Sequence, residues 1–199
     1  VMIGARAFSK EELLTLTDKL KRFTTAEDRP KLNDLIRKEL YHYSEVKHDC
    51  DSVMDTLWKL VNCISDKREV TIEYYRIDRV WRTHRIRPAS LMFTDHYFYL
   101  IAFKTDDDPS KPFYFRVDRI KYITEHRKHF STKEVGDFDE GLLRERSLFM
   151  WPGKLRKIRF EYSGTSVQAV LDKLPTAKII ERSGGKYTLE AEVYGDGIK

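Results

Sequence analysis

Two runs of alternating residues contain the side chains that are best suited to bind an anion. Residues 97–103 read YFYLIAF and residues 113–120 read FYFRVDRI, and both alternate with the period of a β-strand. The residues between them include Asp, Pro and Ser, which is typical of a hairpin loop. If the purely apolar sets of both runs face one core, Tyr99 and Arg116 lie together on the opposite surface. A guanidinium is a planar fork of donors that matches phosphate or carboxylate, and a tyrosine adds a stacking face and a hydroxyl.

Asp118 and Arg119 allow a second interpretation of this cluster. Arg119 is one residue out of phase with Arg116, so it is expected to face the core or to lie at a bulge. Asp118 could pair with either arginine in a surface ion pair worth about 0–1 kcal/mol. The sequence therefore leaves open an anion-binding platform and a strand surface neutralised by its own acid.

A second basic cluster lies in residues 76–87. Its five arginines are Arg76, Arg79, Arg82, Arg85 and Arg87, with Trp81 and His84 between them and Asp78 as the one acid. Such a strand pair attracts polyanions, and its aromatic residues can stack on bases. Arg85 and Arg87 share a strand face, so we favour these two as ligand contacts. The alternative is a solvated face whose charge is balanced by acids such as those of residues 106–108.

The other polar residues support neither a metal site nor a catalytic site. His126 and His129 are three apart, which in a strand turns them to opposite faces. His42, His48 and Cys50 do not have a recognised ligand spacing, and the sequence contains no P-loop, nucleophile elbow or G-x-G-x-x-G motif. We therefore expect no metal, no cofactor and no enzymatic activity.

The composition is that of a globular protein. Hydrophobic residues make up 41% of the 199 residues and aromatic residues 13%, which is enough for a core. No apolar run approaches the length of a membrane span and no signal-peptide pattern is present, so we expect a cytoplasmic protein without a membrane partner. Cys50 and Cys63 are expected to be reduced thiols. The net charge of +5 mildly favours an anionic partner, although solubility alone also explains it.

The elements that must position these residues begin with three amphipathic helices. A capping box from Ser9 to Glu12 begins the first helix. A second helix starts near Asp28 with Pro30 in its first turn, and a third spans about 52–64. Three helices in a row, each with one apolar face, indicate a helical subdomain or a dimerisation arm.

From residue 69 the period changes to that of β-strands. Strands are predicted over 70–75 and 80–86, and residues 121–125 extend the second arm of the hairpin. Pro88 is expected to end the second strand or to lie at a sheet edge, because it cannot donate to a ladder. Four or five short antiparallel strands are too few for a sandwich and predict a small, partly open barrel.

A separate α+β unit is predicted near the end of the sequence. Residues 131–153 form a linker that contains a helix over 142–149. A strand at 158–162, a helix at 166–174 and two strands around a turn at 183–185 then give the order β-α-β-β. This is the first part of a ferredoxin-like βαββαβ unit, and without the last helix and strand its sheet would have an unpaired edge.

Three segments together resemble the WYL domain. They are Pro88-Ala89-Ser90-Leu91, Phe98-Tyr99-Leu100 and Phe115-Arg116-Val117-Asp118-Arg119-Ile120, with Phe98 in place of the name-giving Trp. The resemblance covers roughly residues 69–130 and implies an SH3-like (Sm-like) barrel followed by a C-terminal extension. It also implies that Tyr99 and Arg116 line a ligand pocket. Ser90 could donate a hydroxyl there or could instead occupy a turn.

These observations predict an α+β protein with four parts. Residues 1–66 form a helical linker or dimerisation segment, 67–130 the barrel, 131–153 a linker with a short helix, and 154–199 a partial α+β extension.

The predicted function is that of an effector-sensing region of a bacterial DNA-binding transcriptional regulator. The effector is an anion, either a nucleotide or single-stranded nucleic acid. The expected ligand-binding residues are Tyr99, Arg116, Arg119, Arg85, Arg87 and Ser90. WYL regulators usually carry a winged helix-turn-helix before the helical segment, so we expect a homodimer that contacts DNA through such a module, which this sequence lacks. The alternative is a stand-alone module that binds RNA or single-stranded DNA without a regulatory head.

Overall fold

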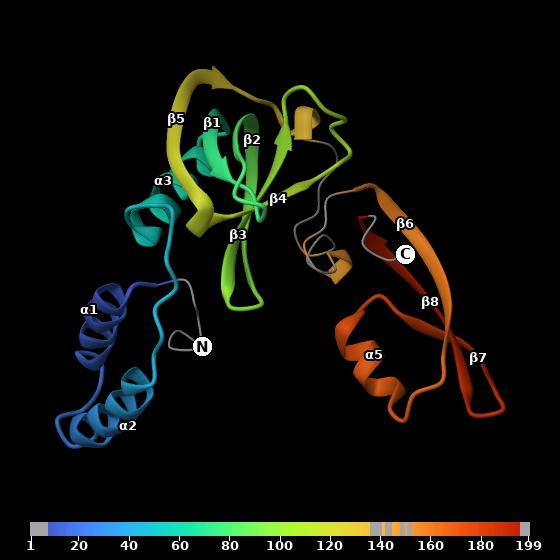
Figure 1. The fold of residues 1–199 in the computed structure, drawn as a ribbon, viewed down its shortest axis with the longest axis horizontal. Coiled ribbons are helices and arrows are strands. Elements are labelled where there is room, and N and C mark those ends of the chain that lie inside the picture. Colours follow the sequence, from blue (N-terminus) through green and yellow to red (C-terminus); the bar gives the residue numbers. More distant parts are fainter. Residues whose placement is uncertain (1–7, 136–140, 142–144, 148–149, 151–152, 196–199) are drawn as a thin grey trace.

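The computed structural model describes residues 8–135, 141, 145–147, 150 and 153–195. Figure 1 shows three parts in chain order: a pair of helices, a five-stranded sheet with a third helix, and a three-stranded sheet with another helix. Both sheets are antiparallel, so the predicted α+β class is confirmed. The helix predicted over 142–149 falls largely outside the described residues.

The first two helices, α1 (Lys10–Lys21) and α2 (Arg29–Tyr41), begin where the sequence predicts. Both hydrogen bonds of the capping box between Ser9 and Glu12 are present, and Pro30 lies in the first turn of α2.

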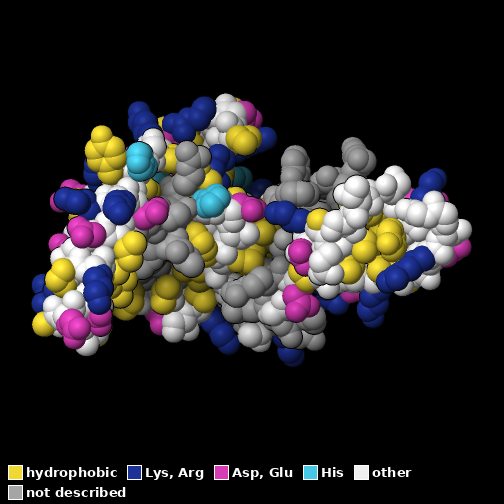
Figure 2. Space-filling view, turned by 90° about the horizontal axis from the view of Figure 1, so that it is seen from below, with side chains coloured by type: hydrophobic (Ala, Val, Ile, Leu, Met, Phe, Trp, Pro, Cys, Tyr) yellow, Lys and Arg dark blue, Asp and Glu magenta, His cyan; other side chains and the backbone are white. Residues whose placement is uncertain are grey.

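The α1–α2 pair has a small core and an exposed apolar surface. Leu13 and Leu40 are buried between the two helices. Phe23 and Leu35 are largely exposed, and Figure 2 shows hydrophobic side chains among charged ones on the face seen from below.

The third helix, α3 (Val53–Ser65), is capped by Ser52 and packs mainly against the sheet. Leu60 and Cys63 of α3 lie in the same core as Val70 and Ile72. This differs from the expected grouping of three helices in one subdomain, because the sheet takes up the apolar face of α3.

The five-stranded sheet has the order β4-β3-β2-β1-β5. Its strands are β1 (Arg68–Tyr75), β2 (Trp81–Thr94), β3 (Tyr97–Lys104), β4 (Phe113–Arg116) and β5 (Ile120–His129). Within the described residues no ladder joins the edges β4 and β5, so closure into an SH3-like barrel remains a prediction.

Pro88 neither ends β2 nor lies on an edge strand, contrary to the sequence prediction. β2 continues to Thr94 between two hydrogen-bonded neighbours, and its pairing with β3 shifts register between Pro88 and Ser90. Such an irregularity accommodates a residue that has no N–H to donate. A two-residue turn then joins β2 to β3, with Asp95 and His96 both at positive φ as in a type I′ turn.

Both faces of the β3 strand are buried. Leu100 and Ala102 lie in the main core, as predicted, but Ile101 and Phe103 on the other face are only 2% and 3% exposed. Ile101 lies in a cluster with residues from far along the chain, including Tyr194. The expectation that this face is open to solvent is therefore wrong, since the C-terminal part of the chain covers it.

The C-terminal sheet has the order β6-β8-β7 and confirms the β-α-β-β sequence of elements. Its elements are β6 (Leu155–Tyr162), α5 (Val167–Lys173), β7 (Lys178–Ser183) and β8 (Lys186–Tyr194). The predicted turn at 183–185 is present, with Gly184 and Gly185 at positive φ. β8 lies between β6 and β7 and is antiparallel to both, which is the arrangement of a split βαβ unit.

The helices in the described part of the chain are all too short or too polar to cross a membrane.

Candidate functional site

Tyr99 and Arg116 face each other across β3 and β4, as the strand periods predict. The guanidinium carbon of Arg116 lies 3.4 Å from the centre of the Tyr97 ring, so Tyr97 supplies the stacking face. Burial raises the pKa of Tyr99 although the charge of Arg116 opposes it, so its hydroxyl stays protonated at neutral pH. Sequence reasoning missed Tyr97, although its position two residues before Tyr99 places it on the same strand face.

Arg116 is held by the protein's own acid. Its Nε lies 3.0 Å and its Nη2 2.7 Å from the two carboxylate oxygens of Asp118. The side chains of Arg116 and Asp118 are 16% and 5% exposed. Burial alone would lower the pKa of Arg116, but the hydrogen bonds and charge of Asp118 outweigh it and raise that pKa. The Tyr-Arg pair is therefore not the open cationic surface that the sequence suggested, because a buried carboxylate neutralises and orients its arginine.

Arg119 lies beside this pair. A single 3₁₀ turn over Val117–Arg119 separates β4 from β5 and changes the direction of successive side chains. The Arg119 side chain lies near the Tyr74 hydroxyl, and its charge acts on both Tyr74 and Tyr99. Among the described residues no carboxylate lies within ion-pair distance of Arg119. The turn is thus the reason that Arg119 joins the Tyr-Arg pair despite being out of phase with Arg116.

Arg85 and Arg87 are brought together, but at a different place and around an acid. Arg85 Nη2 lies 2.9 Å from Glu69 and Arg87 Nε 3.3 Å from it, while Lys128 Nζ is 2.9 Å away. Glu69 is completely buried. Burial would raise the pKa of Glu69, but Lys128 and the two arginines outweigh this and lower it.

The strand register is the sequence signal that could have revealed the Glu69 cluster. Val70 pairs with Ile86, so continuing the register by one residue places Glu69 opposite Arg87. In the sequence analysis, the alternative to ligand binding was that acids such as those of residues 106–108 balance the charge of Arg85 and Arg87. The balancing acid is a buried residue of the neighbouring strand, on the face opposite to Val70 and Ile72.

Ser90 lies inside β2 and is only 7% exposed, so the turn role is wrong. Its backbone pairs with Ile101, on the far side of the irregularity from Pro88. A ligand contact through the Ser90 hydroxyl remains a prediction.

The tip of the β1–β2 hairpin holds the other arginines. Arg79 forms two hydrogen bonds of 2.9 Å with Asp49 and lies over the Tyr75 ring. Arg76 is 3.4 Å from Asp78. Trp81 packs edge to face on Tyr75, with ring centroids 4.6 Å apart. The tip is therefore an aromatic and basic surface that is partly neutralised by local acids.

The Tyr-Arg pair is connected to the start of α3. The backbone carbonyl of Asp118 accepts hydrogen bonds from the N–H groups of Asp49 and Cys50, at 2.8 and 3.4 Å. Asp49 also binds Arg79 at the hairpin tip. One residue, Asp118, thus fixes Arg116 through its carboxylate and the chain before α3 through its carbonyl.

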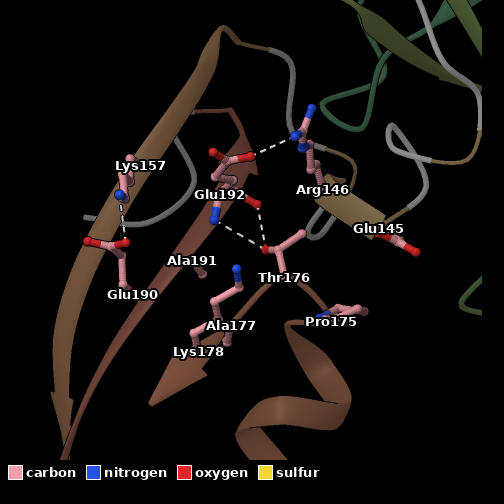
Figure 3. Close-up of a pocket in the computed structure, with 10 residues that line it drawn as sticks. All are labelled: Glu145, Arg146, Lys157, Pro175, Thr176, Ala177, Lys178, Glu190, Ala191 and Glu192. Carbon is pink, nitrogen blue, oxygen red and sulfur yellow. Dashed lines mark hydrogen bonds and ion pairs between the residues drawn. The ribbon is translucent and has the colours of Figure 1, made fainter. Parts of the chain in front are cut away.

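The C-terminal unit has a pocket of about 410 Å³, which sequence reasoning did not anticipate (Figure 3). Lys157 binds Glu190 at 2.6 Å and Arg146 binds Glu192 at 2.6 Å within its walls. The Thr176 hydroxyl donates to the Glu192 carbonyl. Most of its charges thus satisfy one another, which leaves few groups to attract a ligand.

No group of three or more metal-ligating side chains occurs in the part of the chain that the structure describes. Cys50 and Cys63 are buried and unpaired with each other, and burial raises the pKa of Cys50 to about 11. A neutral, buried thiol of this kind is a poor nucleophile.

Comparison with known proteins gives one family match and two solved structures with partial similarity to this chain. Residues 55–125 match the WYL domain family. Proteasome accessory factor B/C (PafBC) of Arthrobacter aurescens superposes with a TM-score of 0.39 and 14% identity over 70% of this chain and 21% of its own. A protein described as CRISPR Cas-related superposes with a TM-score of 0.44 and 14% identity over 94% of this chain and 62% of its own. The chain thus spans about a fifth of the first protein and less than two thirds of the second, and no curated protein sequence matches it.

The matched residues run from α3 through β5, which are the elements that share the main core and carry Tyr99, Arg116 and Arg119. Residues 55–125 of this chain are therefore a WYL domain.

Proposed function

We propose that this chain is the effector-sensing region of a transcriptional regulator, and that its WYL domain binds an anionic ligand beside Tyr97, Tyr99, Arg116 and Arg119. The ligand is a nucleotide or a single-stranded nucleic acid. The observation that supports this most is Arg119, a cation without a carboxylate partner among the described residues, next to two tyrosine rings and an oriented second arginine. Planar guanidinium groups match phosphate oxygens, and the aromatic rings can stack on bases.

The Asp118 contact suggests how binding is transmitted. An anion that binds Arg116 competes with the carboxylate of Asp118. The backbone carbonyl of the same residue accepts the hydrogen bonds of Asp49 and Cys50 before α3. Any shift of Asp118 therefore changes the hydrogen bonds that fix the start of this helix. A ligand can shift the equilibrium between two arrangements of α3 only by the difference between its binding free energies for these arrangements.

The test of the site is the variant Arg119→Ala in the full chain. We expect the affinity for a short single-stranded oligonucleotide to fall by about tenfold, because one charge-assisted contact is lost. The slope of log affinity against log salt should decrease by about one, measured by fluorescence anisotropy. Arg119 is a better choice than Arg116, whose removal would leave Asp118 buried without its partner.

Lys173→Ala is the matched control. It removes one exposed positive charge from α5, outside the WYL domain, and should leave affinity and slope close to those of the parent. If Arg119→Ala also binds like the parent, Arg119 does not belong to the ligand site and the proposed platform is wrong.

The second candidate is a stand-alone module that binds RNA or single-stranded DNA. The hairpin tip favours it, because Trp81 is exposed there beside Tyr75, and Arg82, the next residue in the chain, is exposed too. Hydrogen exchange separates the two functions. A sensor should change the protection of the Asp49 and Cys50 amides when the oligonucleotide binds, whereas a passive module should change only the residues that contact it.

The wider assembly is proposed from the family resemblance alone. A regulator of this kind would contact DNA through a winged helix-turn-helix and would act as a homodimer. The exposed apolar residues of α1–α2, such as Phe23 and Leu35, are compatible with a subunit contact.

A further inference from the structure

The inner face of the five-stranded sheet carries a basic patch around His84, formed by Arg82 and Lys104, that is separate from the proposed effector platform. Arg82 and His84 are on β2 and Lys104 is at the end of β3, in register positions that share the side of Ile86 and Ala102. Phe113 of β4 faces the same side. Tyr99 and Arg116 lie on the opposite face of β3 and β4.

Aromatic rings border this basic patch. Phe113 and Phe115 stack with centroids 6.4 Å apart, and the His84 ring lies 5.4 Å from Phe115. The ammonium groups of Lys104 and Lys111 lie 4.3 and 4.8 Å from the centre of the Phe113 ring. Two cations therefore lie near one ring.

The acids of the neighbourhood leave two cations of the described residues, Arg82 and Lys104, without a carboxylate partner. Asp107 pairs with Lys111, and Asp108 pairs with Lys154 at 2.7 Å. Arg82 and Lys104 have no carboxylate within ion-pair distance in the part of the chain described by the structure. Asp106 is left as the acid whose charge acts on His84 in this basic patch.

The pKa of His84 is affected by this unpaired positive charge. Its burial, together with the charges of Lys104, Arg82 and Arg76, lowers its pKa to about 4, and Asp106 offsets this only in part. The ring is thus kept neutral first by its burial and then by the nearby positive charge. A group with negative charge at this place would be attracted by both Arg82 and Lys104.

We propose that this basic patch is a second anion site, in which Arg82 and Lys104 hold a phosphate group beside His84 and Phe113. The phosphate is that of a free nucleotide or of a nucleic-acid strand. Its charge matches the two cations without a carboxylate partner, and the ring of Phe113 borders the site on the side where a base would lie.

Imidazole NMR of the full chain tests the site directly with inorganic phosphate as the probe. We expect the pKa of His84 to be higher by about 1 or more in phosphate than in chloride at equal ionic strength, because a bound anion favours the charged ring. The spectrum of His84→Gln assigns the resonance among the six histidines.

Lys104→Ala should abolish this difference between phosphate and chloride, although loss of the cation also raises the pKa of His84 in chloride. Lys173→Ala, on α5, should keep the difference. An unchanged pKa of His84 in phosphate, or a Lys104→Ala variant that is folded by its amide spectrum and still responds, would overturn the proposal.

Two further probes identify the carrier of the phosphate. AMP and a short oligonucleotide should each shift the His84 resonance, and the one that does so at the lower concentration is the preferred source. Adenosine should have no effect, and an equal response to adenosine would contradict phosphate recognition. Arg119→Ala should retain the response, so the outcome here is independent of the effector platform on the other face.

Discussion

Glu69 is the buried charge on which the most cations converge in the described structure. Arg85, Arg87 and Lys128 come from two strands on either side of β1, so a single carboxylate ties three strands together. Arg87 also reaches Glu134 at 3.3 Å. A buried carboxylate without partners would be very costly, and here each cation lowers that cost.

Replacement of this carboxylate tests its contribution to stability. Glu69→Gln should reduce the free energy of unfolding at neutral pH by about 2–3 kcal/mol, because Arg87 loses its buried partner. Urea denaturation measures the change. Glu125→Gln removes a half-exposed partner of Arg68 and should cost less than about 1 kcal/mol.

The same residue predicts a pH dependence. The pKa of Glu69 in the folded state is below its ordinary value of 4.5, so its contribution is complete above about that pH and is lost as the pH falls through the lowered value. The difference in unfolding free energy between parent and Glu69→Gln should therefore shrink as the pH falls below about 4.5. A difference that is constant over this range would show that the charge of Glu69 does not stabilise the fold.

At the scale of elements, short connections decide where the side chains lie. The 3₁₀ turn after β4 places Arg119 beside Arg116, and the tight turn at Asp95 and His96 fixes the register of β2 and β3. The junction between α3 and β1 is equally tight. Asp66 caps α3, Lys67 follows at φ 50°, and β1 begins at once with Arg68.

Lys67 offers a test of this junction. It occupies the left-handed position that follows a helix end, where glycine avoids the steric cost of a Cβ. Lys67→Gly should raise the free energy of unfolding by about 0.5–1 kcal/mol, seen as a higher thermal midpoint. Lys67→Ala removes the same exposed side chain but keeps the Cβ, so it should not stabilise the protein. Equal midpoints for the glycine and alanine variants would rule out backbone strain at this residue.

At the scale of the molecule, single residues connect the three parts. Phe98 belongs to the edge of the main core and also packs against the α1–α2 cluster, with its ring 5.8 Å from that of Phe8. At the other end, Tyr114 binds Ser147 at 2.6 Å, and Lys154 holds the pKa of Asp108 well below its ordinary value. The sheet therefore lies between two neighbours that contact it through few side chains.

Phe98→Ala should release the α1–α2 pair more than it unfolds the sheet. Because Phe98 is only half-buried, we expect a loss of about 2 kcal/mol, less than for a fully buried phenylalanine. Hydrogen exchange of the α1 amides should become faster, while that of the β1 amides stays close to the parent. Phe23→Ala, at a largely exposed position, is the control and should change neither. Equal acceleration in α1 and β1 would mean that the two parts unfold together.

Much of the local structure could be predicted because it depends on neighbours in the sequence. The capping box of Ser9 and Glu12, the proline that begins α2 and the glycine turn before β8 act over a few residues. The facing pair of Tyr99 and Arg116 was also predictable, since strand period and hairpin geometry place them opposite each other.

The sequence by itself thus determined the helices, most of the strands and the residues that match the WYL domain. Only the tertiary structure decided which charges are available to a ligand. Asp118 and Glu69 neutralise arginines that a strand pattern shows as exposed, and the C-terminal part covers Ile101 on a face that looks solvated. The physical reason is that periodicity assigns a side chain to a face, whereas burial and ion pairing depend on what another part of the chain places against that face.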